Sequence, residues 1–257
     1  MLNKYSGKRK RNIYESGTDT TFKISRSKIE LFIDCARCFF IDRRLGTDRP
    51  PGFPFNLNNA VDAFLKVEFD KYRLISKPHP LMVENDIDAI PYYDPIINQW
   101  RENFQGIQYL DENTNLIISG AVDDVWINSE KELIVVDYKA TSNSETINKL
   151  NDTWHNSYRR QMDIYQWLLI KNKFSVSPLT YFVYCNAKKR KIEFNNRLNF
   201  EINLIPYEAN PTWVDAKIIE IKECLENNIL PEPSNYCDYC KYLNSVYSEI
   251  TDFDFFG

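Results

Sequence analysis

Acidic residues and a lysine near the middle of the chain have the types and spacing of a site for phosphate chemistry. Asp123 and Asp124 follow one apolar segment, and Asp137 and Lys139 lie at the end of the next. Side chains at positions i and i+2 of a strand point to the same face, so Asp137 and Lys139 are expected to lie together. A turn at 128–131 would fold the two strands into a hairpin and bring Asp123 beside them.

Carboxylates crowded beside a lysine indicate a bound divalent cation. Mg²⁺ or Mn²⁺ prefers oxygen ligands, polarises phosphate and lowers the pKa of bound water. Lys139 would hold or help deprotonate that water and offset developing negative charge. The alternative is a solvated turn at Asp123 and Asp124 with a weak surface ion pair between Asp137 and Lys139. The D-x-K motif alone favours this alternative, but its spacing from G-x-x-D through an apolar strand favours the metal site.

The elements that must position these residues are predicted from periodicity. Strands are expected at 107–110, 116–126, 132–140, 179–185 and 191–205, the third being a near-continuous apolar run typical of a strand covered on both faces. Helices are expected from Ser25 and Ser27 onward and over 57–74, 96–104, 151–172 and 212–227. This order predicts an α/β fold with a central mixed β-sheet flanked by α-helices.

Three sequence segments together resemble the PD-(D/E)xK nuclease superfamily. They are GAVDDVW, ELIVVDYKATS and QMDIYQWLL, and the likeness extends over about residues 22–243. Within the superfamily the chain looks most like the RecB-like exonuclease branch, which includes the CRISPR-associated RecB-like and AddB nucleases. The resemblance implies a restriction-endonuclease-like fold, metal binding by Asp123 and Asp137, a catalytic Lys139, and Gln161 and Tyr165 lining the site.

The family's additional metal-binding histidine, on an early helix, has no histidine counterpart here. Asp62, in Asn59-Ala-Val-Asp62, takes the matching place, and a carboxylate is a suitable hard ligand. Glu68 on the same predicted helix is an alternative. His79 and His155 have no ligand context and are expected in solvated or loop positions.

Two C-x-x-C pairs suggest a second metal site of a different kind. Cys35 and Cys38 lie near the start of the chain, and Cys237 and Cys240 near its end. Four thiolates suit a [4Fe–4S] cluster or a tetrahedral Zn²⁺. Related nucleases tie an early helix to the C-terminus with an iron–sulfur cluster, usually through one early and three late cysteines. We therefore expect a structural site with iron–sulfur slightly favoured over zinc, against the alternative of buried free cysteines.

Local basic residues are candidates for phosphate contacts, which give affinity without reading sequence. The candidates are Arg159, Arg160, Lys188, Lys189 and Arg190. Trp154 and Tyr158 are candidates for stacking on unpaired bases. For each basic residue the alternative is a solvated helix face or an exposed turn.

Composition and charge exclude some classes of protein. Lysine and arginine number 32 and aspartate and glutamate 36, giving a net charge of −4, which excludes coating of nucleic acid by bulk charge. No apolar run is long enough for a membrane helix and the start has no secretory signal, so we expect a cytoplasmic protein without membrane contact. We expect a flexible basic arm at 1–21, a nuclease-like domain at 22–245 that includes the C-terminal cysteines, and a tail at 246–257.

These observations predict a metal-dependent nuclease acting on DNA, with single strands or ends as substrates, in repair, recombination or defence. A helicase or another repair or defence protein is a possible partner. A second hypothesis is a catalytically inactive nucleic-acid-binding or scaffolding protein that keeps the fold, motivated by Asp62. A third is an interaction protein stabilised by zinc at its cysteines.

Overall fold

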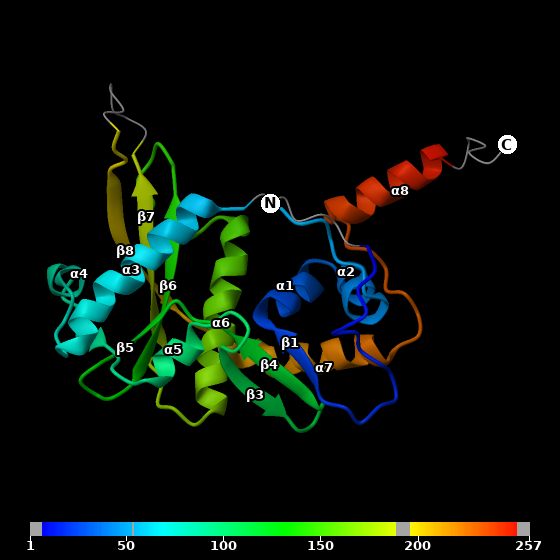
Figure 1. Cartoon of the computed structure of the whole chain (residues 1–257), viewed down its shortest axis with the longest axis horizontal. Helices are drawn as coiled ribbons and strands as arrows, with labels where there is room; N and C mark the ends of the chain where they lie inside the picture. The colour runs from blue at the N-terminus through cyan, green and yellow to red at the C-terminus, as the bar shows by residue number, and fades with distance from the viewer. Residues whose placement is uncertain (1–6, 53, 189–195, 251–257) are drawn as a thin grey trace. The chain divides into compact units, whose positions relative to one another are not determined.

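The computed structural model describes residues 7–52, 54–188 and 196–250 and divides the chain into two compact units (Figure 1). Unit 1 is made of residues 1–53, 110–117 and 215–257. Unit 2 is made of residues 54–109 and 118–214. The chain thus leaves unit 1 and returns to it twice, so that segments from both ends of the sequence build unit 1.

Unit 2 contains a mixed sheet with the strand order β2-β5-β6-β7-β8. Its strands are β2 (Ile90–Pro91), β5 (Asp124–Ile127), β6 (Leu133–Thr141), β7 (Leu179–Ala187) and β8 (Phe200–Glu208). Strands β6 and β7 are parallel, and the other neighbours are antiparallel. Its helical segments are α3 (Asn56–Leu74), α4 (Pro80–Glu84), α5 (Ile96–Trp100), η2 (Thr153–His155), α6 (Asn156–Lys171) and η3 (Pro211–Trp213).

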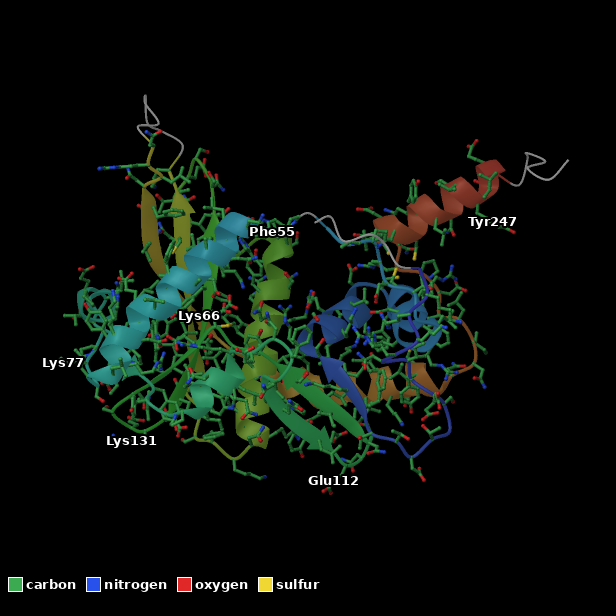
Figure 2. The ribbon with its side chains drawn as sticks, in the orientation of Figure 1. Phe55, Lys66, Lys77, Glu112, Lys131 and Tyr247 are labelled. Carbon is green, nitrogen blue, oxygen red and sulfur yellow. The ribbon has the colours of Figure 1, made fainter. Side chains whose placement is uncertain are left out.

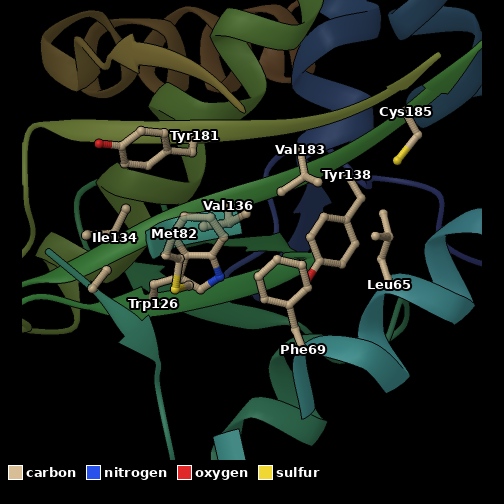
Figure 3. Close-up of a cluster of buried hydrophobic side chains, with 11 residues drawn as sticks. Leu65, Phe69, Met82, Trp126, Ile134, Val136, Tyr138, Tyr181, Val183 and Cys185 are labelled. Atoms are coloured by element: carbon tan, nitrogen blue, oxygen red, sulfur yellow. The ribbon is translucent and has the colours of Figure 1, made fainter. Parts of the chain in front are cut away.

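One hydrophobic core of unit 2 lies between helix α3 and one face of this sheet (Figure 3). Phe69 of α3 stacks on Trp126 and lies against Tyr138. Because side chains alternate along β6, Ile134, Val136 and Tyr138 enter this core. The intervening residues, Asp137 and Lys139 among them, therefore point to the opposite face, where they meet side chains of α6.

The predicted strand 116–126 is two strands in the structure. Strand β4 (Leu116–Gly120) belongs to a second sheet, of order β1-β4-β3, whereas β5 begins at Asp124 in the five-stranded sheet. β3 covers Ile107–Asp111. Residues 121–123 connect β4 and β5, so Asp123 stands at a break between sheets and not inside a continuous strand. The predicted hairpin with the following strand is confirmed, because β5 and β6 pair antiparallel.

Unit 1 begins with contacts that the polar composition of residues 1–21 does not indicate. Tyr14 is buried, its hydroxyl donates to Glu226, and the Ser16 hydroxyl donates to the same carboxylate at 2.8 Å. The elements of this unit include β1 (Phe22–Ser25), α1 (Arg26–Asp34), α2 (Ala36–Phe40), the π-helical turn η1 (Ile41–Leu45), α7 (Val214–Glu226) and α8 (Asp238–Ile250).

Two features of unit 1 differ from the sequence-based expectation. The predicted first helix is interrupted at Cys35, which adopts an extended conformation between α1 and α2. At the other end, α8 continues through 246–250, which were expected to belong to a tail. In the part of the chain that the structure describes, no helix combines the length and apolar character required to span a membrane. The predicted α/β class, a mixed sheet with flanking helices, is confirmed.

Candidate active site and cysteine cluster

Strand β6 brings the central acidic residues and the lysine together. Asp137 is buried, and the Lys139 ammonium forms an ion pair with its Oδ2. Asp123, at the break before β5, accepts a hydrogen bond through Oδ2 from the backbone N–H of Tyr138 at 2.9 Å. The expected convergence of Asp123, Asp137 and Lys139 is therefore present in the structure.

Helix α6 adds a glutamine and a tyrosine to the same group. The Gln161 amide nitrogen donates to Asp137 Oδ1 at 2.6 Å and to the Tyr165 hydroxyl at 3.0 Å, and its oxygen lies 3.4 Å from Lys139 Nζ. Gly120 explains how the helix approaches so closely. A Cβ at Gly120 would lie 2.7 Å from Tyr165 Cε1, so only glycine leaves room for that ring.

Helix α3 contributes Asp62 and a lysine that sequence reasoning missed. Lys66 projects from the middle of α3 (Figure 2), and its Nζ lies 2.9 Å from Asp62 Oδ2 and 3.8 Å from Asp123 Oδ1. Its position one helical turn after Asp62 was the signal available in the sequence. Glu68, the alternative to Asp62, instead bonds Nε2 of the buried His79 at 3.0 Å. The geometry therefore favours Asp62. His79 lies in a loop, directly before α4, which is one of the two positions expected, but its side chain is buried.

Asp124, the neighbour of Asp123, belongs to a buried ionic network and not to a solvated turn. It is 0% exposed and accepts hydrogen bonds from Arg73, from Arg101 at 2.9 Å and from the Tyr138 hydroxyl at 2.7 Å. Arg101 also donates to the backbone oxygen of Asp123 at 3.0 Å. Because a buried charge is costly without its partners, this network fixes the backbone that presents Asp123.

The charges at the site suit a divalent cation. Burial raises the pKa of Asp62. Burial is also the largest cause that raises the pKa of Asp123 to about 7; nearby Asp137 adds to this shift, while Lys139 and Lys66 oppose it. One buried oxygen of Asp62, Oδ1, has no hydrogen-bond partner among the described residues. A Mg²⁺ or Mn²⁺ ion bound to these oxygens would offset the burial and repulsion that oppose their ionisation, and it would give Asp62 Oδ1 a partner.

Lys139 carries its charge in this environment. Burial by itself would lower the pKa of the ammonium, but Asp137 and Asp123 outweigh it and raise the pKa. Lys139 Nζ also lies 4.6 Å from the centre of the Tyr158 ring, a distance suited to a cation–π contact. The group is therefore equipped to hold a phosphate oxygen or a water as a cation.

Divalent-cation affinity is expected to increase about tenfold per pH unit up to about pH 7 and then to level off. The reason is that Asp123 must lose a proton before it can coordinate an ion. In the ion-free protein the folding stability has the opposite pH dependence. Between about pH 4 and about pH 7 the folded state retains a proton on Asp123 that the unfolded state has lost, so stability falls as the pH rises through this range. Calorimetric titration of Mn²⁺ at several pH values checks the affinity, and a pH-independent affinity contradicts it.

The four cysteines of the two C-x-x-C pairs form a cluster inside unit 1. All four sulfurs lie within 4.8 Å of one another, and all four residues are buried. Cys38 Sγ is 3.5 Å from Cys237 Sγ and 3.6 Å from Cys240 Sγ. Arg49 Nη2 lies 3.2 Å from Cys237 Sγ and would balance part of a thiolate charge. The predicted pairing of early and late cysteines is therefore present.

Burial opposes ionisation of these thiols in the absence of an ion. It raises the pKa of Cys38 to about 11 and that of Cys240 further. Cys35 differs: burial raises its pKa, but hydrogen bonds from the backbone at Ser234 and Cys38 outweigh this and lower the pKa to about 7. Four buried thiols of this kind ionise together only with a cation between them, so the donor set fits a metal.

The basic residues proposed for nucleic-acid contact have several local roles. The Arg159 guanidinium donates to the backbone oxygen of Leu150 and to Asn156, and Lys188 pairs with Glu201 and donates to Thr146 at 2.9 Å. Arg160 precedes Gln161 on α6. Lys189 and Arg190 lie outside the described residues. Phosphate binding by these residues stays a prediction.

No curated protein matches the chain. A solved structure titled "Crystal structure of SSO0001" overlaps with a TM-score of 0.34 and 12% identity, covering 86% of this chain and 79% of that one. The family model for the PD-(D/E)XK nuclease superfamily matches residues 23–245, which include every residue of the candidate site. On that match, this chain belongs to the PD-(D/E)XK nuclease superfamily.

Proposed function

We propose that the protein is a nuclease that uses Mg²⁺ or Mn²⁺ to hydrolyse phosphodiester bonds of DNA, at ends or in single strands, in repair, recombination or defence. The observation that carries this proposal is the cluster of Asp123, Asp137 and Lys139, in which Gln161 donates a hydrogen bond to Asp137. Family membership supports nuclease chemistry. The choice of DNA and the likeness to the RecB-like branch rest on the sequence motifs.

Each residue has a role that follows from its position. Asp123, Asp137 and Asp62 would hold the cation, which when bound supplies Lewis acidity and lowers the pKa of a water. Gln161 orients the Asp137 carboxylate through its 2.6 Å hydrogen bond, and Tyr165 in turn accepts from Gln161. Lys139 contributes a fixed positive charge where negative charge develops on the phosphate.

A catalytically inactive, nucleic-acid-binding protein is the second candidate. Asp62 in place of a histidine and Lys66 between Asp62 and Asp123 favour it, because an ammonium at this position repels a cation. Calorimetry separates the two candidates: stoichiometric Mn²⁺ binding that Asp137→Asn removes supports the nuclease, whereas no binding supports the inactive protein.

Cleavage of single-stranded DNA with Mg²⁺ or Mn²⁺, and none with EDTA, is the expected result of an assay on single-stranded, duplex and flapped DNA. The same strands made of RNA test the choice of nucleic acid. Absence of cleavage on every substrate with both cations contradicts the proposal, provided that the purified protein is folded by circular dichroism.

For the cysteine cluster we propose a single tetrahedral ion, zinc in preference to the [4Fe–4S] cluster first expected. A Zn–S bond of about 2.3 Å places the sulfurs of a tetrahedral site about 3.8 Å apart, and the closest separations here are 3.5, 3.6 and 3.8 Å. In a cubane each thiolate binds a different iron, so the sulfurs lie farther apart. The role proposed is structural: the ion joins α2 to the C-terminal segment.

A further inference from the structure

The loop that follows β6 builds a cavity together with the residues that lead into α6. The cavity has a volume of about 350 Å³, and its wall includes Glu145, Lys149, Asp152, Trp154 and His155. The fully buried Asn186 of β7 anchors this loop: its side chain accepts from the backbone N–H of Asn143 at 2.8 Å and donates to the backbone oxygen of Glu145 at 2.9 Å. The wall is therefore part of the folded structure.

Contacts with neighbouring residues fix the orientation of Trp154 at the edge of this cavity, although its side chain is not buried. Its Nε1 donates to Asp152 Oδ2 at 3.2 Å, and its ring centre lies 3.5 Å from that of His155. Even so, 52% of Trp154 is exposed. Contacts that hold an indole in one orientation while leaving half of it in solvent provide a preorganised stacking surface.

The aromatic side chains form a short path from the catalytic lysine to this surface. Lys139 Nζ lies 4.6 Å from the centre of the Tyr158 ring, and the Tyr158 ring lies 5.7 Å from the Trp154 ring, edge to face. The Tyr158 ring is therefore already in contact with Lys139, and the Trp154 ring is the next one along this path. Of the two aromatic residues proposed to stack on bases, the geometry selects Trp154.

The polar groups of the cavity suit a base better than a phosphate. Glu145 and Asp152 place two negative charges in the wall against the one positive charge of Lys149, so the wall has a net negative charge that would repel a phosphate. His155 is 2% exposed, and its Nδ1 accepts from the backbone N–H of Asp152, so the neutral ring carries its proton on Nε2. That Nε2 is buried without a hydrogen-bond partner in the described part of the chain.

We propose that Trp154 stacks on an unpaired nucleobase close to the scissile phosphate and that the adjoining cavity receives the edge of that base. The inference rests on the proposed nuclease function and names its substrate class: nucleic acid that is single-stranded at the site. A paired base cannot use such a surface, because its faces are already stacked inside the duplex.

The test measures binding of a fluorescein-labelled oligothymidylate to the full-length protein in buffer without added Mg²⁺ or Mn²⁺, which prevents metal-dependent cleavage and leaves the metal at the cysteines in place. A second probe of the same length carries abasic tetrahydrofuran residues. We expect the wild type to bind the thymidylate about tenfold more tightly than the abasic strand, and Trp154→Ala to bind both equally. Trp154→Phe, which restores an aromatic face, should recover most of the difference. Tyr93→Ala removes an aromatic side chain that is 61% exposed elsewhere in unit 2 and serves as the matched control.

The outcomes for this inference and for the nuclease proposal are separable. A wild type that cleaves DNA with Mn²⁺ but binds thymidylate and abasic strands equally overturns the stacking surface and leaves the nuclease intact. A base preference that disappears in Trp154→Ala, in a protein that cleaves nothing, supports the stacking surface and contradicts the nuclease. Equal loss of base preference in Trp154→Ala and Tyr93→Ala also overturns the assignment to Trp154.

Discussion

Asp137→Asn is expected to reduce divalent-dependent cleavage by about a thousandfold while the protein stays folded. The substitution keeps the shape of the side chain, and the asparagine oxygen can still accept from Gln161. It removes a negative charge that the cation needs and that pairs with Lys139. Removing one of two neighbouring carboxylates also relieves repulsion with Asp123, so we expect no loss of thermal stability.

A second variant, at Lys139, tests whether cation binding and phosphate stabilisation depend on different residues. Lys139→Met should lose cleavage to a similar extent but keep its affinity for Mn²⁺, because it removes a positive charge and no ligand. Asp86→Asn, at an exposed position after α4, is the matched control and should cleave normally. Cleavage rates measured beside calorimetric Mn²⁺ binding distinguish the three variants. Near-normal Mn²⁺-dependent cleavage by purified Asp137→Asn would falsify the assignment of the site.

Cys237→Ser is expected to release the bound metal and to lower the melting temperature of unit 1 by about 10 °C or more. Metal binding at a cluster of thiolates contributes directly to folding, and this cluster joins segments from both ends of the chain. Helix α8 should be affected most. Cys240 is its buried residue, whereas Tyr242 and Tyr247 are 73% and 67% exposed. Without the metal, a 13-residue helix with so little packing is marginal in water.

Metal analysis, the visible absorption spectrum and amide hydrogen exchange check this prediction together. The wild type should contain one zinc ion per chain and be colourless, whereas a broad visible band with bound iron would favour the [4Fe–4S] cluster. In Cys237→Ser, exchange should become faster along α8. Cys224→Ala, on α7 and outside the cluster, is the control and should keep both the metal and the protection. Unchanged metal content in Cys237→Ser contradicts a four-cysteine site.

The contacts among the candidate site residues were predictable wherever local periodicity determines geometry. Strand alternation placed Asp137 and Lys139 on one face, helical spacing placed Gln161 and Tyr165 together, and both are found in the structure. The two C-x-x-C pairs indicated their association because paired thiols at that spacing have few other uses. Lys66 was missed, although it lies one turn from Asp62, because a lysine on a helix usually faces solvent.

Other features depended on contacts between segments distant in the sequence. Neither the break between β4 and β5 nor the burial of Asp124 follows from the local pattern, because a D-D pair after an apolar segment reads equally well as a turn. The partners of Asp124 are Arg73, Arg101 and Tyr138, which come from three other places in the chain. Likewise, the polar segment that carries Tyr14 is held by Glu226, from near the other end of the chain.

The sequence by itself therefore determined which residue types could bind a metal ion, which strand and helix faces carry them, and the family's arrangement of strands and helices. Backbone periodicity is a local property and can be read without knowing the fold. Only the tertiary structure decided which of Asp123 and Asp124 joins Asp137 and Lys139 and which is buried among arginines, where Lys66 lies, how close the sulfurs are, and that Trp154 is held in one orientation with one half exposed. Those outcomes depend on burial and on charges brought together from distant segments, and burial exists only once the chain has folded.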